Sequence, residues 1–229
     1  MQSVLITGAA RGLGLALAER YAARSDHRVF AVARDPSAAR ELRDLARRSA
    51  ALEIIGADVT VADDVAALAE HVVRSNVRLD LLVNNAGAAD YTRLGELDDG
   101  VLERTMRVNA FAPLLLVQAL RASFATSAKI VNITSILGSI ELADGSAGFP
   151  YRMSKAALNM ATKQLAHTLR RDGIAVLALH PGWVRTRMGG RRATLDIASS
   201  ADGMVATIDA FSLADTGAYR QYDGTRLPW

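Results

Sequence analysis

The chain has 229 residues, half of them hydrophobic and 22% charged, enough for one well-buried domain over residues 1–229. The net charge of +3 is small and the arginines are spread along the chain, which argues against a nucleic-acid partner. The absence of cysteine excludes disulfides and thiolate chemistry, and no metal site is expected. Without a signal-peptide pattern or a membrane-length apolar run, the chain is expected to be cytoplasmic, with no membrane partner.

Short apolar runs alternate with longer amphipathic stretches along the whole chain. Strands are predicted at residues 4–7, 28–33, 53–57, 79–84, 129–134 and 175–180, and helices at residues 13–24, 37–48, 62–75, 97–124 and 151–171. Most of the strands are continuous apolar runs, which indicates burial on both faces. The alternation predicts an α/β protein, a single-domain doubly wound Rossmann fold with a central parallel β-sheet flanked by helices. Residues 182–200 are expected to form a loop or lid, followed by a last helix at 201–212 and a short strand near 218–222.

The turn after the first strand is rich in glycine. Thr7, Gly8, Gly12 and Gly14 follow the strand directly and open a helix. Glycine lets the backbone approach a pyrophosphate, and a helix N-terminus favours its charge. The spacing G-x-x-x-G-x-G departs from the G-x-G-x-x-G fingerprint, and such a turn can also be an ordinary strand–helix connection. The rest of the chain favours a dinucleotide site.

Tyr151 and Lys155 stand four residues apart in YRMSKAALNM, at the start of a strong helical pattern. This spacing puts both on one helix face, where the phenol and the ammonium can face the same ligand. Such pairs also occur on helix surfaces without any function. Lysine is found only at positions 129, 155 and 163, which suggests that a guanidinium is unsuitable at 155. Over a nucleotide site, the pair indicates an acid that gives or takes a proton during hydride transfer.

Five motifs occur in the order and spacing of a classical short-chain dehydrogenase/reductase, a family that the chain resembles over almost its whole length. They are Thr7-Gly8-x-x-x-Gly12-x-Gly14, Asn84-Asn85-Ala86-Gly87, Ser135, Tyr151-x-x-x-Lys155 and Pro181-Gly182. The segments YRMSKAALNM, LALHPGWV and YDGTRLPW are similar to those of the branch that holds the sniffer carbonyl reductases and C-factor. One departure is the interval between Ser135 and Tyr151, sixteen residues, which is several residues longer than is commonest in the family.

The resemblance implies a catalytic set of Asn109, Ser135, Tyr151 and Lys155. Tyr151 is the expected general acid/base, and Lys155 is expected to lower the pKa of the phenol and to bind the nicotinamide ribose. Ser135 would donate to the substrate carbonyl, with Ser139 as the alternative farther past the strand. Asn109 matches the family's asparagine, which supports a water relay to the lysine and stands at a helix distortion.

The end of the second strand indicates the cofactor. An acid there binds a ribose 2′-hydroxyl, whereas an arginine accommodates a 2′-phosphate. Ala33 stands where NAD-preferring relatives usually carry the acid, Arg34 follows it, and Arg11 is a second possible phosphate partner. Asp35 is an alternative ribose ligand, although an acid before Pro36 also signals a helix start. The prediction is NADP(H).

The other cofactor contacts follow from the resemblance. The expected cofactor-binding residues are Gly8, Arg11, Gly12, Leu13, Gly14, Arg34, Asp58, Val59, Asn85, Ala86, Gly87, Tyr151, Lys155, Pro181, Gly182, Val184 and Thr186. Asp58 and Val59 would hold the adenine, although Asp58 is also a candidate helix cap. The four arginines between residues 185 and 192 could attract an anionic substrate or clamp a cofactor phosphate, whereas a solvated basic loop is the simpler interpretation.

These features predict an oxidoreductase that moves a hydride between nicotinamide and a carbonyl or alcohol substrate. A nucleotide-sensing or signalling protein on the same fold is the alternative, and the intact Ser/Tyr/Lys set argues against it. An extended epimerase is disfavoured, because the chain lacks residues for a separate substrate domain. The substrate pocket is expected from residues 87–94, 137–150 and 183–195. The resemblance also implies a homodimer or homotetramer, paired through the two long helices.

Overall fold

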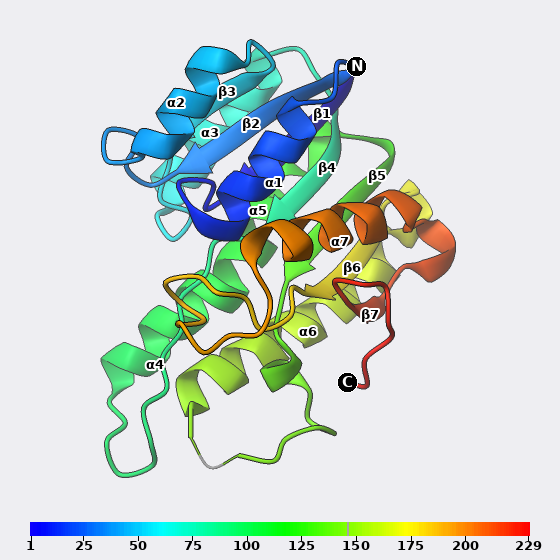
Figure 1. Ribbon diagram of the computed structural model, residues 1–229. Coiled ribbons are helices and arrows are strands. Elements are labelled where there is room, and N and C mark those ends of the chain that lie inside the picture. Colours follow the sequence, from blue (N-terminus) through cyan, green and yellow to red (C-terminus); the bar gives the residue numbers. More distant parts are fainter. Residues whose placement is uncertain (146) are drawn as a thin grey trace.

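The computed structural model describes residues 1–145 and 147–229, and a single seven-stranded sheet forms its centre (Figure 1). The spatial order is β3-β2-β1-β4-β5-β6-β7, and every neighbouring pair is parallel. The strands are β1 (Gln2–Thr7), β2 (His27–Ala33), β3 (Leu52–Gly56), β4 (Leu79–Asn84), β5 (Phe124–Ile133), β6 (Ala175–His180) and β7 (Ala218–Gln221). The predicted doubly wound Rossmann fold is confirmed.

Helices cover both faces of the sheet. They are α1 (Gly12–Ala22), α2 (Arg40–Arg48), α3 (Ala62–Arg74), α4 (Asp99–Met106), α5 (Ala112–Leu120), α6 (Phe149–Leu169) and α7 (Ile197–Ala210). One apolar core joins the sheet to α1, α2 and α7, and a second joins its other face to α3, α5 and α6. In β1, Val4 and Ile6 belong to the first core and Leu5 to the second. This burial on two sides is why the strands are unbroken apolar runs.

The helix predicted at residues 97–124 is interrupted. A π-helical turn (Arg107–Phe111) separates α4 from α5, and a 3-10 turn (Arg121–Ser123) follows α5. Because Pro113 has no backbone N–H, the carbonyl of Asn109 cannot receive its usual α-helical hydrogen bond. Phe124, which the sequence assigned to the helix, is the first residue of β5.

Three other predicted boundaries are wrong by about three to five residues, each for a local reason. β5 begins five residues before the predicted start, in a polar stretch where Ser127 has a φ of 72°. α7 begins at Ile197 rather than at 201, because the Asp196 carboxylate accepts the Ser199 amide at 2.8 Å and caps the helix. α2 begins at Arg40 rather than at 37, since Asp35 closes a turn in front of the helix and does not cap it.

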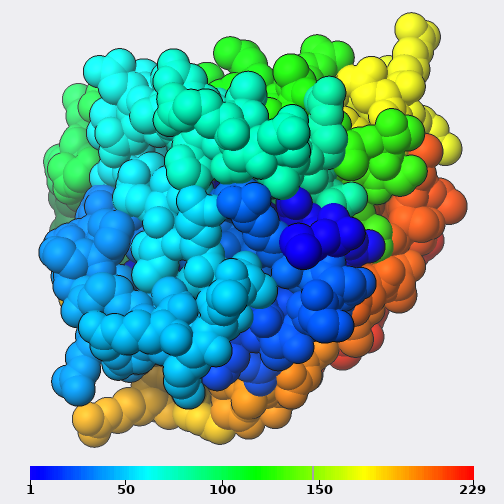
Figure 2. Space-filling view, turned by 90° about the horizontal axis from the view of Figure 1, so that it is seen from above, coloured from blue at the N-terminus to red at the C-terminus, as the bar shows by residue number. Residues whose placement is uncertain are grey.

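The carboxyl ends of the parallel strands meet at one edge of the sheet. The loop between β6 and α7, yellow to orange in Figure 1, lies at this edge below the start of α1. The view from above shows the first residues, in dark blue, between cyan, green and orange segments, as expected for a chain whose first strand is central (Figure 2). Within residues 1–145 and 147–229, no helix combines the length and the apolar character needed to cross a membrane.

Candidate active site

The turn between β1 and α1 requires glycine at two close approaches. Gly8 has a φ of 66°, and a Cβ there would lie 2.9 Å from the Cα of Ala86. A Cβ on Gly14 would lie 2.3 Å from the carbonyl oxygen of Gly8. The Asn85 side-chain amide donates to the carbonyl oxygens of Thr7 and Gly8, at 2.8 and 3.2 Å. The turn is therefore held against the segment after β4, where the strand order reverses and nucleotides bind in such sheets.

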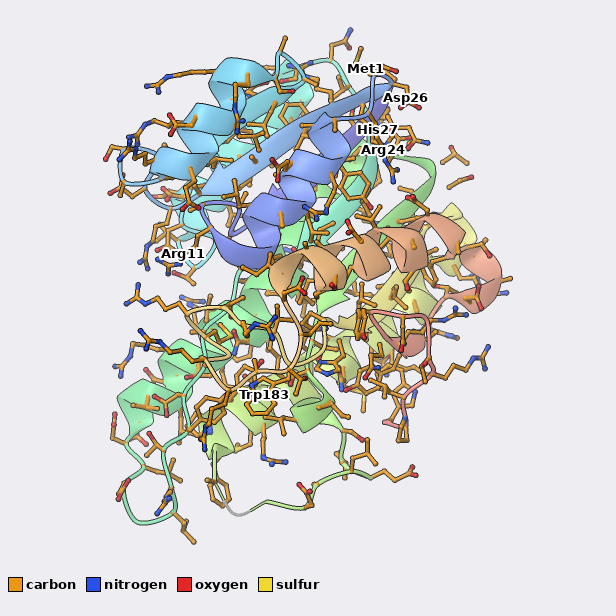
Figure 3. The ribbon with its side chains drawn as sticks, in the orientation of Figure 1. Met1, Arg11, Arg24, Asp26, His27 and Trp183 are labelled. Carbon is orange, nitrogen blue, oxygen red and sulfur yellow. The ribbon has the colours of Figure 1, made fainter. Side chains whose placement is uncertain are left out.

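The first turn of α1 presents backbone amides to this edge. Among the described residues, no side chain caps the helix at Arg11, and its first turn holds no acid. Gly12, with a φ of 58°, and Leu13 begin the helix. Figure 3 shows Arg11 at the start of α1, with its side chain exposed. A pyrophosphate fits this position, because free amides and the helix dipole both favour an anion.

The ends of β2 and β3 bring Arg34 toward Asp58. The Arg34 side chain is 82% exposed, and its guanidinium lies 3.9 Å from the Asp58 carboxylate. Burial by itself would raise the pKa of Asp58, but hydrogen bonds from Thr60 and the Arg34 charge hold it below its usual value. Val59 is buried beside them. The carboxylate of Asp35, in contrast, is occupied by its own turn, which argues against it as the ribose ligand.

Asn109 lies in the π-helical turn and links it to the segment after β4. Its side-chain amide donates to the Ala88 carbonyl at 2.7 Å and to the Ser154 hydroxyl at 2.9 Å, while its Oδ1 accepts the Ala88 amide at 2.8 Å. A Cβ on Gly87 would meet Asn109 Oδ1 at 3.1 Å and Lys155 Nζ at 3.7 Å. Asn109 and Lys155 therefore flank Gly87 from two different helices, and the helix distortion implied by the resemblance is present.

Tyr151 and Lys155 lie one turn apart on the buried face of α6, and Ser135 follows the end of β5. Their exposed fractions are 7%, 5% and 7%. Lys155 Nζ lies 5.8 Å from the centre of the Tyr151 ring and donates to the Ile133 carbonyl at 2.8 Å. The strand end and the helix thus deliver a phenol, an ammonium and a hydroxyl to one place, shielded from water.

Burial dominates the titration of the phenol and the ammonium. It raises the pKa of Tyr151 to about 12, although hydrogen bonding with the Ser135 hydroxyl acts in the opposite direction. It also lowers the pKa of Lys155 to about 8. The sequence predicted that Lys155, together with the oxidised nicotinamide, lowers the phenol pKa. In the protein alone the net direction is the opposite, because desolvation by burial is the largest effect. A neutral phenol is the form that donates a proton.

Ser139, the alternative to Ser135, is engaged elsewhere. Its hydroxyl donates to the main-chain oxygen of Trp229 at 3.1 Å and accepts the Leu142 amide at 3.2 Å. Ser135 caps the 3-10 turn Ile136–Gly138 and lies beside the phenol of Tyr151. The geometry favours Ser135.

The loop between β6 and α7 approaches the glycine turn from the other side. The Thr186 methyl group lies 3.8 Å from the position that a Cβ on Gly12 would take. The Pro181 carbonyl accepts the Ser200 hydroxyl at 2.6 Å, Gly182 has a φ of 83°, and Val184 is buried. The loop therefore places the predicted segment 181–186 over the start of α1.

Side chains within this loop hold its shape. The Trp183 indole, labelled in Figure 3, donates to the Gly189 carbonyl at 2.9 Å. Arg185 donates to the carbonyls of Ala193 and Thr194 and lies 3.8 Å from the Asp196 carboxylate. The other three arginines of the loop, Arg187, Arg191 and Arg192, are exposed. These contacts favour the solvated basic loop over a phosphate clamp.

The sequence did not single out three side chains that lie at the site. The Tyr91 ring packs 5.7 Å from the Tyr151 ring and is half exposed. Ser154 donates to the Tyr151 carbonyl at 2.8 Å, and Asn159 donates to the Gly138 carbonyl at 3.1 Å. Positions 154 and 159 fall on the same helix face as Tyr151 and Lys155, so polar residues on that face were an available signal.

The fold, the glycine turn and the buried Ser/Tyr/Lys group together define a short-chain dehydrogenase. A family model described as short chain dehydrogenase matches residues 2–195, and the chain belongs to this family. The C-signal protein of Myxococcus xanthus is 38% identical over 154 residues, which are 66% of this chain and 93% of that protein. The 1-hydroxy-2-glutathionyl-2-methyl-3-butene dehydrogenase of Rhodococcus sp. (strain AD45) is 32% identical, with 100% of both chains covered.

Solved structures agree with this assignment. The carbonyl reductase Sniffer of D. melanogaster has a TM-score of 0.95 and 34% identity, with 100% of both chains covered. The NADPH-bound carbonyl reductase from chicken fatty liver has a TM-score of 0.95 and 36% identity, covering 100% of this chain and 99% of that one. The resemblance to the sniffer and C-factor branch is confirmed.

Proposed function

We propose that this chain is an NADP(H)-dependent oxidoreductase that transfers a hydride between nicotinamide and a carbonyl or alcohol substrate, with reduction of aldehydes or ketones as its main direction. The observation that carries the proposal is the buried group of Ser135, Tyr151 and Lys155 at the end of β5, beside the segment that packs on the glycine turn. The NADPH-bound chicken enzyme and a carbonyl reductase from Pseudomonas aeruginosa PAO1 in complex with NADP support the cofactor. Residues 1–229 act as one domain.

The cofactor is assigned along the carboxyl edge of the sheet. The first turn of α1 would hold the pyrophosphate. The exposed guanidinium of Arg34 would bind the 2′-phosphate, with Arg11 as a second candidate partner. Asp58 and Val59 would hold the adenine. Residues 85–87 would bind the nicotinamide end, together with the loop that carries Pro181, Gly182, Val184 and Thr186.

Bound cofactor supplies the hydride, and the protein supplies the proton and the orientation. The Ser135 hydroxyl donates to the substrate carbonyl oxygen and fixes its position. Tyr151, neutral because it is buried, gives its proton to that oxygen as negative charge develops there. The Lys155 ammonium stabilises the phenolate that remains and binds the nicotinamide ribose. Asn109 supports the proton supply to Lys155, from the π-helical turn on the far side of Gly87.

A purely nucleotide-sensing protein would not need this arrangement. The phenol, the ammonium and the hydroxyl are all buried together, and burying an ammonium is costly, a cost for which proton transfer gives a reason and nucleotide sensing gives none. This cost favours the enzyme over the signalling alternative. The cytoplasmic location stays a prediction from the composition.

We also propose that the chain forms a homodimer, or a tetramer built from such dimers, through α5 and α6. Phe111, Leu114 and Leu115 form an exposed apolar strip along the π-helical turn and α5, and Met153 and Met160 are exposed on α6. Apolar side chains grouped on helices in this way are typical of surfaces that another chain covers. The family resemblance places the pairing on these helices.

The proposed function is tested by Tyr151→Phe in an NADPH-oxidation assay against a panel of aldehydes, ketones, diketones and quinones. We expect kcat to fall by about 10²–10⁴-fold, because the proton donor is lost. NADPH affinity, measured by fluorescence titration, should stay largely intact. Tyr21→Phe is the matched control, since this tyrosine lies on the buried face of α1, in the core. Wild-type turnover in Tyr151→Phe would contradict the role of Tyr151, and a preference of the wild type for NADH would contradict the cofactor assignment.

A further inference from the structure

The last strand contacts the turn that carries Ser135. The Tyr219 hydroxyl of β7 donates to the backbone carbonyl of Ser135 at 2.6 Å. The Tyr219 side chain is only 2% exposed, so this hydrogen bond is shielded from water and is stronger than the same contact at the surface. The Gly138 amide donates to the same carbonyl at 2.8 Å. Both lone pairs of the Ser135 carbonyl are therefore used, one by its own turn and one by β7.

Trp229 holds the continuation of the same turn. Its main-chain oxygen accepts the amides of Ile140 and Glu141, each at 3.0 Å, in addition to the Ser139 hydroxyl. The Trp229 ring packs 5.1 Å from the Tyr219 ring. We refer to residues 218–229, which make both sets of contacts, as the C-terminal brace.

The turn that the brace contacts also packs on the helix that carries the catalytic pair. A Cβ on Gly138 would lie 2.8 Å from the backbone carbonyl carbon of Lys155, so the turn is packed directly on α6. The turn that begins at Ser135 is thus held by contacts with both α6 and the brace. Its hydroxyl can reach the substrate and the Tyr151 phenol only if the peptide at Ser135 keeps its orientation.

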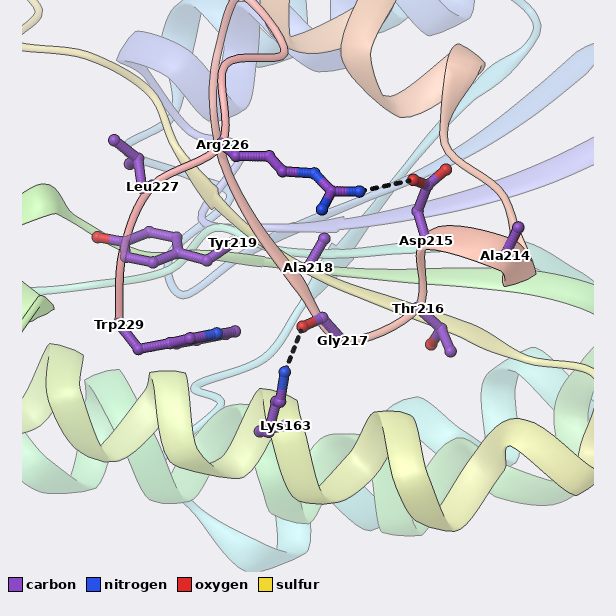
Figure 4. A pocket seen from close by; sticks show the side chains of 10 residues that line it. All are labelled: Lys163, Ala214, Asp215, Thr216, Gly217, Ala218, Tyr219, Arg226, Leu227 and Trp229. Carbon is purple, nitrogen blue, oxygen red and sulfur yellow. Dashed lines mark hydrogen bonds and ion pairs between the residues drawn. The ribbon is translucent and has the colours of Figure 1, made fainter.

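A cavity lies beside the brace. Tyr219 and Trp229 line a cavity of about 320 Å³ together with Lys163, Asp215 and Arg226 (Figure 4). Its charges are satisfied internally, since Arg226 lies 3.9 Å from Asp215 and Lys163 donates to the Gly217 carbonyl at 3.2 Å. In the described part of the chain, none of the predicted catalytic or cofactor residues lines it. Beside this cavity the Tyr219 ring packs on Trp229, and its hydroxyl is the group that reaches the Ser135 peptide.

We propose that Tyr219 is a positioning residue, whose hydroxyl orients the Ser135 hydroxyl through the Ser135 carbonyl. This inference rests on the proposed role of Ser135 in binding the substrate carbonyl. Removing the Tyr219 hydroxyl leaves the Gly138 bond in place, so the turn persists while the serine gains orientational freedom. Reactions of this kind are sensitive to small misplacements of an orienting group.

The activity test uses Tyr219→Phe in the wild type and in a Ser135→Ala background. We expect kcat to fall about tenfold in the wild type, with the KM for NADPH unchanged, because only orientation is lost. In Ser135→Ala, measured by single turnover with excess enzyme, Tyr219→Phe should cause no further loss, as for two residues that act as a unit. An equal loss in both backgrounds, or no loss in the wild type, would overturn the proposal. Tyr222→Phe is the matched control in the same segment.

A measurement without substrate separates this inference from the proposed function. Hydrogen exchange of the amides at residues 136–141 should become faster in Tyr219→Phe and stay at the wild-type rate in Tyr222→Phe. Unchanged exchange in Tyr219→Phe would refute the bracing role. If the wild type reduces none of the carbonyls in the panel, the proposed function fails, while the exchange result still decides whether the brace holds the turn.

Discussion

At the Tyr151–Lys155 pair, loss of water outweighs the attraction between a phenolate and an ammonium. Both side chains are buried, so the neutral form of each is favoured, and their pKa values move to about 12 and about 8. A guanidinium at position 155 would keep its proton under all conditions and could not respond in this way. In the protein alone the phenol of Tyr151 therefore carries its proton, which is the form needed to protonate the substrate oxygen during carbonyl reduction.

The lowered pKa of Lys155 predicts that the rate of carbonyl reduction falls at high pH. Its ammonium is present below about pH 8 and is lost as the pH rises through that value. Because the ammonium stabilises the developing phenolate, kcat/KM for carbonyl reduction should fall with an apparent pKa near 8. The phenol itself titrates near pH 12, above the range of the assay. In Lys155→Met this fall should be absent and the rate low throughout, whereas a wild-type profile that is flat to high pH would contradict the assignment.

The same shift has the opposite effect on folding. Between pH 8 and the unshifted value of 10.5, the unfolded chain binds a proton at Lys155 that the folded chain has released. The contribution of Lys155 to stability therefore increases with pH over this window, while activity decreases. Loss of activity above pH 8 without a lower melting temperature would distinguish titration of the site from unfolding.

At the scale of elements, the β1–α1 turn and the segment after β4 are built to fit each other. Gly8 and Gly14 leave room for backbone where any side chain would overlap, and Asn85 bonds the resulting turn. The first turn of α1 is thereby aimed at the carboxyl edge of the sheet, where an anion can meet its amides.

Gly14→Ala tests whether the β1–α1 turn binds the cofactor. Its Cβ would overlap the Gly8 carbonyl oxygen at 2.3 Å, which is backbone and cannot turn away, so α1 must shift. We expect NADPH affinity, measured by calorimetry, to fall by at least about tenfold, since the pyrophosphate amides move. Gly100→Ala is the control, because its Cβ would meet mainly the flexible end of Arg104 and a helical alanine adds about 0.5–1 kcal/mol of stability. An unchanged NADPH affinity in Gly14→Ala would show that the β1–α1 turn does not bind the cofactor.

At the scale of the whole molecule, the strand order gathers residues that are distant in sequence. β1, β4 and β5 are neighbours, so the glycine turn, Gly87 and Ser135 emerge at one edge. The outer side of α5 is turned away from the sheet and keeps its apolar strip exposed. The order of the strands thus determines where the site residues come together. The exposed helix faces determine which surface would form the interface between copies of the chain.

Leu115→Glu tests the proposed pairing. Leu115 is 43% exposed on α5, and a charge there would have to be buried in the dimer. We expect the variant to be monomeric by light scattering while keeping its fold by circular dichroism. Val73→Glu, which changes an exposed valine on α3, should leave the wild-type mass unchanged. A wild type that is already monomeric, or a Leu115→Glu variant that stays paired, would show that these helices are not the interface.

Local features of the sequence were sufficient for much of the fold and site. β4 and β6 begin and end where the apolar runs do, because burial on both faces leaves a continuous local pattern. The glycine turn and the Tyr151–Lys155 spacing are equally local, since each depends on neighbours in the chain. The branch of the family and the preference for NADP(H) followed from short motifs, because a phosphate or a proton acceptor needs specific groups at specific spacings.

Tertiary structure alone decided the properties that depend on distant partners. The pKa direction of Tyr151 follows from burial beneath the surrounding loops, which no motif encodes. Asn109 is separated in sequence by 21 residues from its partner Ala88 and by 45 residues from Ser154. The hydrogen bond from Tyr219 to Ser135 joins residues that are 84 positions apart. The sequence by itself determined which groups carry the chemistry, because their types and spacings are local. Their protonation and alignment were set only by the packed fold, since desolvation and long-range hydrogen bonds exist only once the chain is folded.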